Sequence, residues 1–129
     1  MSISYTYDAD KSHIITKVSG VVTTKETLEY MDRINADPRI SKPFYEIVDF
    51  ADTDNFDFGY FESNQLIEKL AKLREDKGYM GTILIADRDL IQGMSNMFQS
   101  IGECHNVPIT VVHSFQEAED MISNLLEAG

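Results

Sequence analysis

Residues 2–22 read SISYTYDADKSHIITKVSGVV, and this stretch decides the fold. Ile3, Tyr5 and Tyr7 alternate with small polar residues, which is the period-two pattern of a strand with one solvated face. A short polar turn leads into a second strand-like run, in which Gly20 is a candidate bulge. We therefore expect two consecutive strands joined by a tight turn, an uncommon opening for an α/β domain.

Helix-like and strand-like patterns then alternate to give the element order ββαβαβαβα. Apolar residues recur at helical spacing in four segments. Two of these begin with a capping box, in which a hydroxyl and a glutamate three residues later bond each other's backbone. The expected helices follow Thr23 (capping box with Glu26), Asp57, Asp87 and Ser114 (capping box with Glu117), and the expected strands cover residues 44–51, 82–86 and 109–112.

The run TILIA at residues 82–86 predicts how the sheet is covered. A continuous apolar strand, in contrast to an alternating one, is buried on both faces, as in a parallel sheet packed between helices. Parallel neighbours need crossover connections, which are right-handed and place helices on the faces of the sheet. The sequence therefore predicts an α/β fold with a mixed five-stranded sheet covered by four helices, forming a single domain over residues 1–129.

The net charge, the lengths of the apolar runs and the cysteine count exclude several classes of partner and of location. The chain has 129 residues, a net charge of −11 and one cysteine. This acidity argues against binding to nucleic acid or to an anionic membrane surface. No apolar run approaches 18 residues and no signal-peptide pattern is present, so we expect no membrane insertion. A lone cysteine is typical of the reducing cytoplasm, where we expect the protein to reside.

An acidic and aromatic segment follows the third expected strand. Its sequence over residues 52–61 is DTDNFDFGYF, and residues 52–59 are expected to form a loop. Ligands of open α/β sheets bind outside the carboxyl ends of the strands, where this loop would meet those after Ala86 and His113. The sequence predicts a ligand or partner surface formed by Phe56, Asp57, Phe58, Tyr60, Phe61, Asp87 and Met94. In the alternative interpretation, Phe58 and Phe61 pack into the core.

The aspartates of the same region are candidates for a metal site. Asp49, Asp52 and Asp87 are the candidate ligands, since hard cations prefer carboxylate oxygens. Asp52 also begins a stretch similar to a calcium loop. However, Asp57 occupies the sixth position, where such a loop has glycine, and Ser63 occupies the twelfth, where it has glutamate. A solvated loop with Asp57 capping the next helix is the simpler interpretation, and no cofactor is expected.

No other pattern indicates catalysis. Cys104 and His105 are adjacent, and adjacent residues on a helix do not face each other, so a nucleophile pair is not expected. His13 and His113 match no metal spacing, and no glycine-rich loop precedes a helix. A phosphate-accepting receiver domain would need a lysine after the last strand, where this chain has His113. We therefore expect the protein not to be an enzyme.

The element order resembles that of the STAS domain of sulfate transporters and anti-sigma factor antagonists, and of its SpoIIAA-like relatives. The resemblance covers about residues 3–127 and includes GVVT at 20–23 and the central strand FYEIVDF at 44–50. It implies a SpoIIAA-like, or STAS-like, fold. Anti-sigma antagonists carry a phosphorylatable serine at the start of the second helix, where Phe58 stands here, so the phosphorylation switch does not carry over.

The resemblance is closer to the small stand-alone SpoIIAA-like proteins and to the lipid-binding CRAL-TRIO domains of similar fold. These relatives imply binding of a protein partner or of a small apolar molecule, without catalysis. The function we favour from the sequence is a cytoplasmic regulatory module that docks a protein partner or a second copy of itself. Docking would use the surface around residues 52–62, called here the 52–62 surface.

Two further functions remain open. A carrier of a small apolar or lipid-like ligand would need an internal pocket, expected to be lined by Phe61, Leu90, Met94, Met97 and Phe98. A chain of this size encloses only a small cavity without losing core, so a large lipid would have to open the helices. A metal-assisted enzyme would require Asp49, Asp52 and Asp87 to converge within ligand distance.

Overall fold

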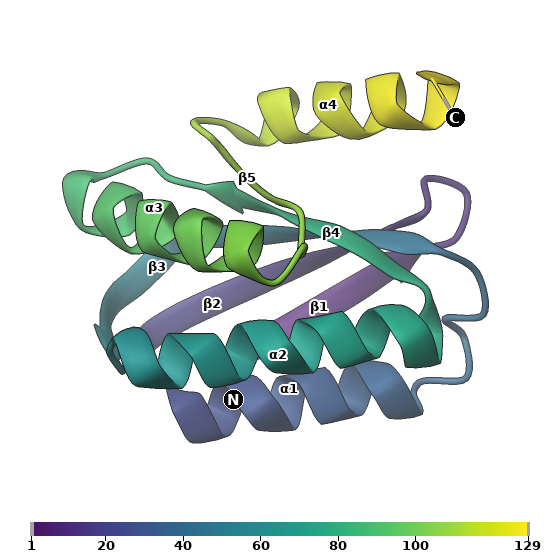
Figure 1. Cartoon of the computed structure of the whole chain (residues 1–129). Coiled ribbons are helices and arrows are strands. Elements are labelled where there is room, and N and C mark those ends of the chain that lie inside the picture. Colours follow the sequence, from purple (N-terminus) through teal and green to yellow (C-terminus); the bar gives the residue numbers. More distant parts are fainter. Residues whose placement is uncertain (1, 129) are drawn as a thin grey trace.

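The computed structural model describes residues 2–128 of the chain (Figure 1). Its elements follow the predicted order ββαβαβαβα. They are β1 (Ile3–Asp8), β2 (His13–Thr23), α1 (Thr24–Ala36), β3 (Phe44–Asp57), α2 (Tyr60–Lys77), β4 (Tyr79–Ile85), α3 (Asp89–Cys104), β5 (Ile109–Val112) and α4 (Phe115–Ala128).

Within residues 2–128 the strands form one five-stranded sheet in the order β1-β2-β3-β4-β5. The first two strands pair antiparallel, as the polar turn between them predicts, and the remaining neighbours pair parallel. Each parallel step is made by one crossover helix, so strands that are consecutive in the chain are also adjacent in space. The mixed sheet predicted from the sequence is confirmed.

The helices cover the two faces of the sheet unequally (Figure 1). On one face, α1, α2 and α3 pack side by side over a large apolar core that includes Phe44, Leu66 and Tyr79. On the other face, α4 alone covers a smaller cluster around Ile47 and Ile83. Strand β4 is buried between these layers, which is the reason that its sequence is apolar without alternation.

The segment predicted as a loop over residues 52–59 is instead mostly strand. Strand β3 continues to Asp57, and its last part pairs with the end of β2, from Ser19 opposite Asp52 to Thr23 opposite Asp57. The predicted bulge at Gly20 is confirmed by a register shift beside it and by its φ of 70°. Aspartate and asparagine are rare in strands. Here the pairing of residues 52–57 with β2 outweighs their low strand propensity.

Two helix starts agree with the predicted capping boxes. The Thr23 hydroxyl accepts from the backbone N–H of Glu26 at 3.2 Å, and the Ser114 hydroxyl accepts from that of Glu117 at the same distance. Helix α2 ends at Gly78, which has the left-handed φ of 80° that favours glycine at this position.

The other two predicted caps are wrong. Helix α2 is capped at Gly59, whose N–H donates to the Glu62 carboxylate at 2.9 Å, because β3 carries Asp57 out along the strand before the helix begins. Helix α3 starts one residue later than predicted, with Arg88 as its N-cap residue and Asp87 outside the helix. Arg88 instead donates to the Phe50 carbonyl at 2.6 Å and so ties this turn to β3.

Candidate functional site

A glutamate lies inside the core. Along β3 the side chains of Phe44, Glu46, Val48 and Phe50 face the layer formed by α1 and α2, and all four are buried. Glu46 itself is 4% exposed. Glutamate is almost never buried to this degree without a partner, because taking a charge out of water is costly. Glu46 and the side chains around it therefore form the candidate functional site.

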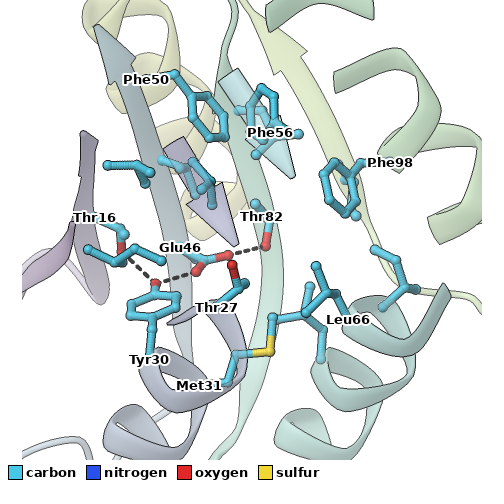
Figure 2. A pocket seen from close by; sticks show the side chains of 18 of the residues that line it. Thr16, Thr27, Tyr30, Met31, Glu46, Phe50, Phe56, Leu66, Thr82 and Phe98 are labelled. Carbon is cyan, nitrogen blue, oxygen red and sulfur yellow. Dashed lines mark hydrogen bonds between the residues drawn. The ribbon is translucent and has the colours of Figure 1, made fainter. Parts of the chain in front are cut away.

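Four hydroxyl groups hold the Glu46 carboxyl group, and Figure 2 shows those of Thr16, Tyr30 and Thr82. On one side the Tyr30 hydroxyl donates to Oε2, and Tyr30 in turn lies 2.5 Å from the Thr16 hydroxyl. On the other side the Thr82 hydroxyl donates to Oε1 at 2.6 Å and lies 2.5 Å from the Tyr79 hydroxyl. The five side chains come from α1, β2, β3 and β4, so this network connects the sheet to one of its covering helices.

The hydrogen bonds can all point toward the carboxylate. Thr16 can donate to Tyr30 and Tyr79 to Thr82, which leaves every hydroxyl proton used once. Burial nevertheless raises the pKa of Glu46, and the bonds from Thr82 and Tyr30 only partly oppose that effect. Burial and the nearby carboxyl also raise the pKa of Tyr30 and of Tyr79 well above the usual value, so both stay neutral.

The carboxyl group faces a cavity of about 80 Å³ between the sheet, α1, α2 and α3. Its wall is almost entirely apolar and carries Glu46 with its hydroxyl partners at one side (Figure 2). The lining residues are Ile3, Thr16, Val18, Val22, Thr27, Tyr30, Met31, Glu46, Val48, Phe50, Phe56, Phe58, Leu66, Ile67, Leu70, Thr82, Leu84, Phe98 and Ile109. This combination of an apolar wall and one convergent polar group is typical of small-molecule sites.

Four phenylalanines form a continuous edge-to-face row along one side of the cavity. Phe50 contacts Phe56, Phe56 contacts Phe58, and Phe58 contacts Phe98, with ring centroids 5.5, 5.6 and 5.8 Å apart. The last three are half-buried, as is Thr27, whereas the other lining residues are buried. The cavity therefore comes nearest to solvent at this aromatic row, at the carboxyl end of β3.

The predicted surface residues divide into two groups. Phe56 and Phe58 point inward and line the cavity, as the core alternative predicted for Phe58. Tyr60 and Phe61 are 66% and 70% exposed on the first turn of α2, so the core alternative is wrong for Phe61. Asp57 and Asp87 are exposed, and Met94 is half-buried outside the cavity lining, so these three are not brought to the cavity.

The predicted lining of an internal pocket is wrong for four of its five residues. Only Phe98 lines the cavity, while Phe61, Leu90, Met94 and Met97 do not. The cavity lies between the sheet, α1, α2 and α3, and the first turns of α2 and α3 present Phe61 and Leu90 to solvent. Helical spacing showed which residues share a face but not which helix would cover the space beside Glu46.

The candidate metal ligands do not assemble. Among residues 2–128, no three histidine, cysteine, aspartate or glutamate side chains are placed to hold a metal ion. The convergence of Asp49, Asp52 and Asp87 that a metal-assisted enzyme requires is therefore not found in this range. The Asp49 carboxylate instead accepts from the backbone N–H of Ala51 at 2.9 Å.

Glu46 is not among the site residues predicted from the sequence. The available signal was its position, since Glu46 shares the period-two face of Phe44, Val48 and Phe50. A carboxylate at an inward position of a central strand indicates a buried polar site. Its partners could not be found in the same way, because Thr16, Tyr30 and Thr82 are distant in the chain and unremarkable in pattern.

Comparison with known proteins supports the fold. No protein-family model and no curated protein matches the chain. Among solved structures, the chain is similar to an uncharacterized protein of the DUF3478 family, with a SpoIIAA-like fold, from Shewanella loihica PV-4. The TM-score is 0.55 over 93% of this chain and 91% of that one, at 13% sequence identity. The predicted SpoIIAA-like fold is confirmed. Separately, no helix within residues 2–128 combines the length and apolarity needed to cross a membrane.

The raised pKa of Glu46 predicts how stability changes with pH. The folded protein keeps the Glu46 proton above the usual pKa of 4.5, whereas the unfolded chain releases it there. The contribution to the free energy of unfolding is therefore full below pH 4.5 and falls as pH rises through the folded pKa, by up to about 1.4 kcal/mol per pH unit. Tyr30 and Tyr79, the other titratable groups facing Glu46, stay neutral in this range.

This dependence is measured by urea denaturation from pH 4.5 to 8, comparing the protein with Glu46→Leu. The other carboxylates are common to both chains and cancel in the difference. The Thr16–Tyr30 and Thr82–Tyr79 pairs remain in the variant, so it should fold and become the more stable of the two as pH rises. A difference that stays constant or changes in the opposite direction would contradict a raised pKa.

Proposed function

We propose that this protein is a non-catalytic binding module that holds a small, largely apolar ligand in the cavity beside Glu46. The observation that carries the proposal is the position of Glu46, a buried carboxyl group at the wall of a cavity whose other lining is mostly hydrocarbon. Small-molecule sites have this composition, with an apolar body and a few polar groups that fix the orientation of the ligand.

The energetic cost of Glu46 supports a functional role. A hydrophobic residue of similar size would fill part of the cavity and would avoid the desolvation of a carboxyl group. Natural interiors are close-packed, so the cavity lowers the stability of the fold through lost packing contacts. Burial of the Glu46 carboxyl group lowers it further through desolvation. Binding sites commonly retain such unfavourable features, because the ligand compensates for them when it is bound.

The size of the cavity limits the ligand. At about 80 Å³ the cavity has roughly half the volume of a ~150 Å³ cavity that accepts benzene. A compact ligand of a few heavy atoms fits without rearrangement. A longer one would have to displace the half-buried Phe56 and Phe58, which stand where the cavity approaches solvent.

The 52–62 surface supports a second candidate function, docking of a protein partner or a second copy. Tyr60 and Phe61, consecutive residues on the first turn of α2, are both largely exposed. The capping bond between Gly59 and Glu62 fixes this turn. Aromatic side chains held rigidly at a surface are enriched in protein interfaces, because they bury much area at little entropic cost.

Native mass spectrometry of protein purified gently from its own host tests both candidates. We expect a small-molecule adduct on the wild-type chain. Val48→Phe places a ring in the cavity and should abolish the adduct. Val21→Phe makes the same change at an exposed site on β2, outside the cavity lining, and should retain it. Circular dichroism checks that each variant is folded.

The outcomes separate the two functions. An adduct that is absent from the wild type, or that Val48→Phe retains, would overturn ligand binding in this cavity. A dimer or a co-purified protein that is lost on changing Tyr60 and Phe61 to serine would support docking through the 52–62 surface. A monomer that carries the adduct, with or without those serines, would contradict docking.

A further inference from the structure

We propose that the ligand is a small organic ammonium ion, whose nitrogen pairs with the Glu46 carboxylate and whose apolar body lies along the phenylalanine row. This inference rests on the proposed ligand-binding function and adds the chemical class of the ligand.

The Glu46 carboxylate has acceptor capacity left over. Its two oxygens offer about four lone-pair sites, and Tyr30 and Thr82 occupy one site on each oxygen. No other donor within residues 2–128 is hydrogen-bonded to this carboxylate. Buried acceptors are normally satisfied, so the free positions on the cavity side indicate a ligand that donates hydrogen bonds.

The cavity also lacks a positive charge of its own. None of the described lining residues is lysine, arginine or histidine. The four hydroxyl groups orient the carboxylate but do not neutralise it. Removing a carboxylate from water without a cation is expensive, and a ligand that brings an ammonium group supplies the missing charge and up to three N–H donors.

The aromatic wall suits a cation with an apolar body. Phe50, Phe56, Phe58 and Phe98 line the cavity, and Tyr30 adds a fifth ring beside the carboxyl group. Ammonium ions are attracted to the faces of aromatic rings, more strongly where water is excluded. Methylene groups of the same ligand would bury against these rings and against Leu66 and Ile67.

The charge of the chain favours the same class of ligand. The net charge is −11, and the exposed Asp57 lies in the sequence between the two phenylalanines at the solvent-side end of the cavity. A field of this sign raises the local concentration of cations and repels anions. A fatty acid would bring its carboxylate to Glu46 and would be disfavoured both on approach and in the cavity.

The first test uses three matched probes, n-butylammonium, 1-butanol and butyrate, titrated into dialysed protein at pH 8 and followed by calorimetry or by NMR shifts. We expect butylammonium to bind at least about tenfold more tightly than butanol, because hydrogen bonds to a charged acceptor are the stronger ones. Butyrate should show no binding. Glu46→Leu should remove the preference for butylammonium over butanol, while butanol still binds. If Glu46→Leu does not fold, Glu46→Gln serves as the second variant.

The probes distinguish failure of this inference from failure of the proposed function. Equal affinity for butylammonium and butanol, or a preference that survives in both Glu46 variants, would overturn the ammonium class while leaving ligand binding intact. If none of the three probes binds, both proposals are overturned. Butyrate binding as tight as that of butylammonium would also overturn the ammonium class.

A second measurement follows from proton balance. At a pH where Glu46 is protonated in the ligand-free protein, binding of the ammonium ion releases that proton to solvent. The complex then contains a Glu46 carboxylate and an intact ammonium group. Affinity for butylammonium should then rise about tenfold per pH unit until the pH exceeds the pKa of Glu46. Affinity for butanol should not rise in this way, and an affinity for butylammonium that stays constant as the pH rises from 4.5 to 8 would contradict proton displacement at Glu46.

Discussion

Replacing Thr82 by valine should destabilise the protein by about 2–4 kcal/mol at pH 8, although the two side chains have nearly the same shape. The change removes the hydroxyl that donates to Glu46 Oε1 and that also pairs with Tyr79. Glu46 loses one of its two donors, and the buried Tyr79 hydroxyl loses its partner. Urea denaturation measures this loss in the free energy of unfolding. We expect a lower midpoint concentration of urea, with the same dependence of the free energy on urea concentration in both chains.

A neighbouring threonine provides the control. Thr110 on β5 is half-buried, and no hydrogen bond of its side chain is found within residues 2–128, so Thr110→Val should cost less than about 1 kcal/mol. In the Glu46→Leu background, Thr82→Val should cost at least about 1 kcal/mol less than in the wild type, since only the Tyr79 bond is then lost. An equal cost in both backgrounds would show that Thr82 does not act through Glu46.

The second large effect is expected at Gly102, near the end of α3. A Cβ atom there would lie 2.6 Å from the Val107 carbonyl oxygen and 3.1 Å from Ile109 Cδ1. The space is closed because the chain turns back sharply, with the N–H of Val107 donating to the Gly102 carbonyl at 2.9 Å. Gly102→Ala should therefore cost about 2–3 kcal/mol, even though alanine is the better helix former.

Gly93 is the matched control, since it lies in the same helix with nothing within 4 Å of its would-be Cβ. Gly93→Ala should raise the free energy of unfolding by about 0.5–1 kcal/mol through helix propensity alone. Thermal or urea denaturation of the two variants measures the contrast. Similar effects of the two changes would mean that the close approach of α3 to β5 carries no energetic weight.

Local pattern was enough to predict the architecture. The alternation of Ile3, Tyr5 and Tyr7 gave the first strand, and the capping hydroxyls of Thr23 and Ser114 gave two helix starts. These signals depend on residues within one or two turns of each other. The spatial order of the strands, β1-β2-β3-β4-β5, was not predicted, because a right-handed crossover fixes the face on which a helix lies but not which strands become neighbours.

The parts that were missed depend on contacts between distant residues. The end of β3 has a loop-like composition, and only its ladder with β2 makes it a strand. Glu46 is held by Thr16 and Tyr30, 30 and 16 residues before it, and by Thr82, 36 residues after it. No periodicity within one element contains this information. An internal apolar pocket could therefore be proposed from the sequence, but the residues that line it could not be identified.

The agreement between strand order along the chain and strand order in the sheet has a consequence for synthesis on the ribosome. Each new strand pairs with one that has already emerged, so the sheet can grow in one direction without waiting for a distant segment. The exception is α4, which follows all five strands in the chain and packs over Ile47, Ile83 and Ile85. Until α4 has emerged, that face of the sheet is an exposed apolar surface, so the 14 residues of α4 protect the nascent domain from association through this face.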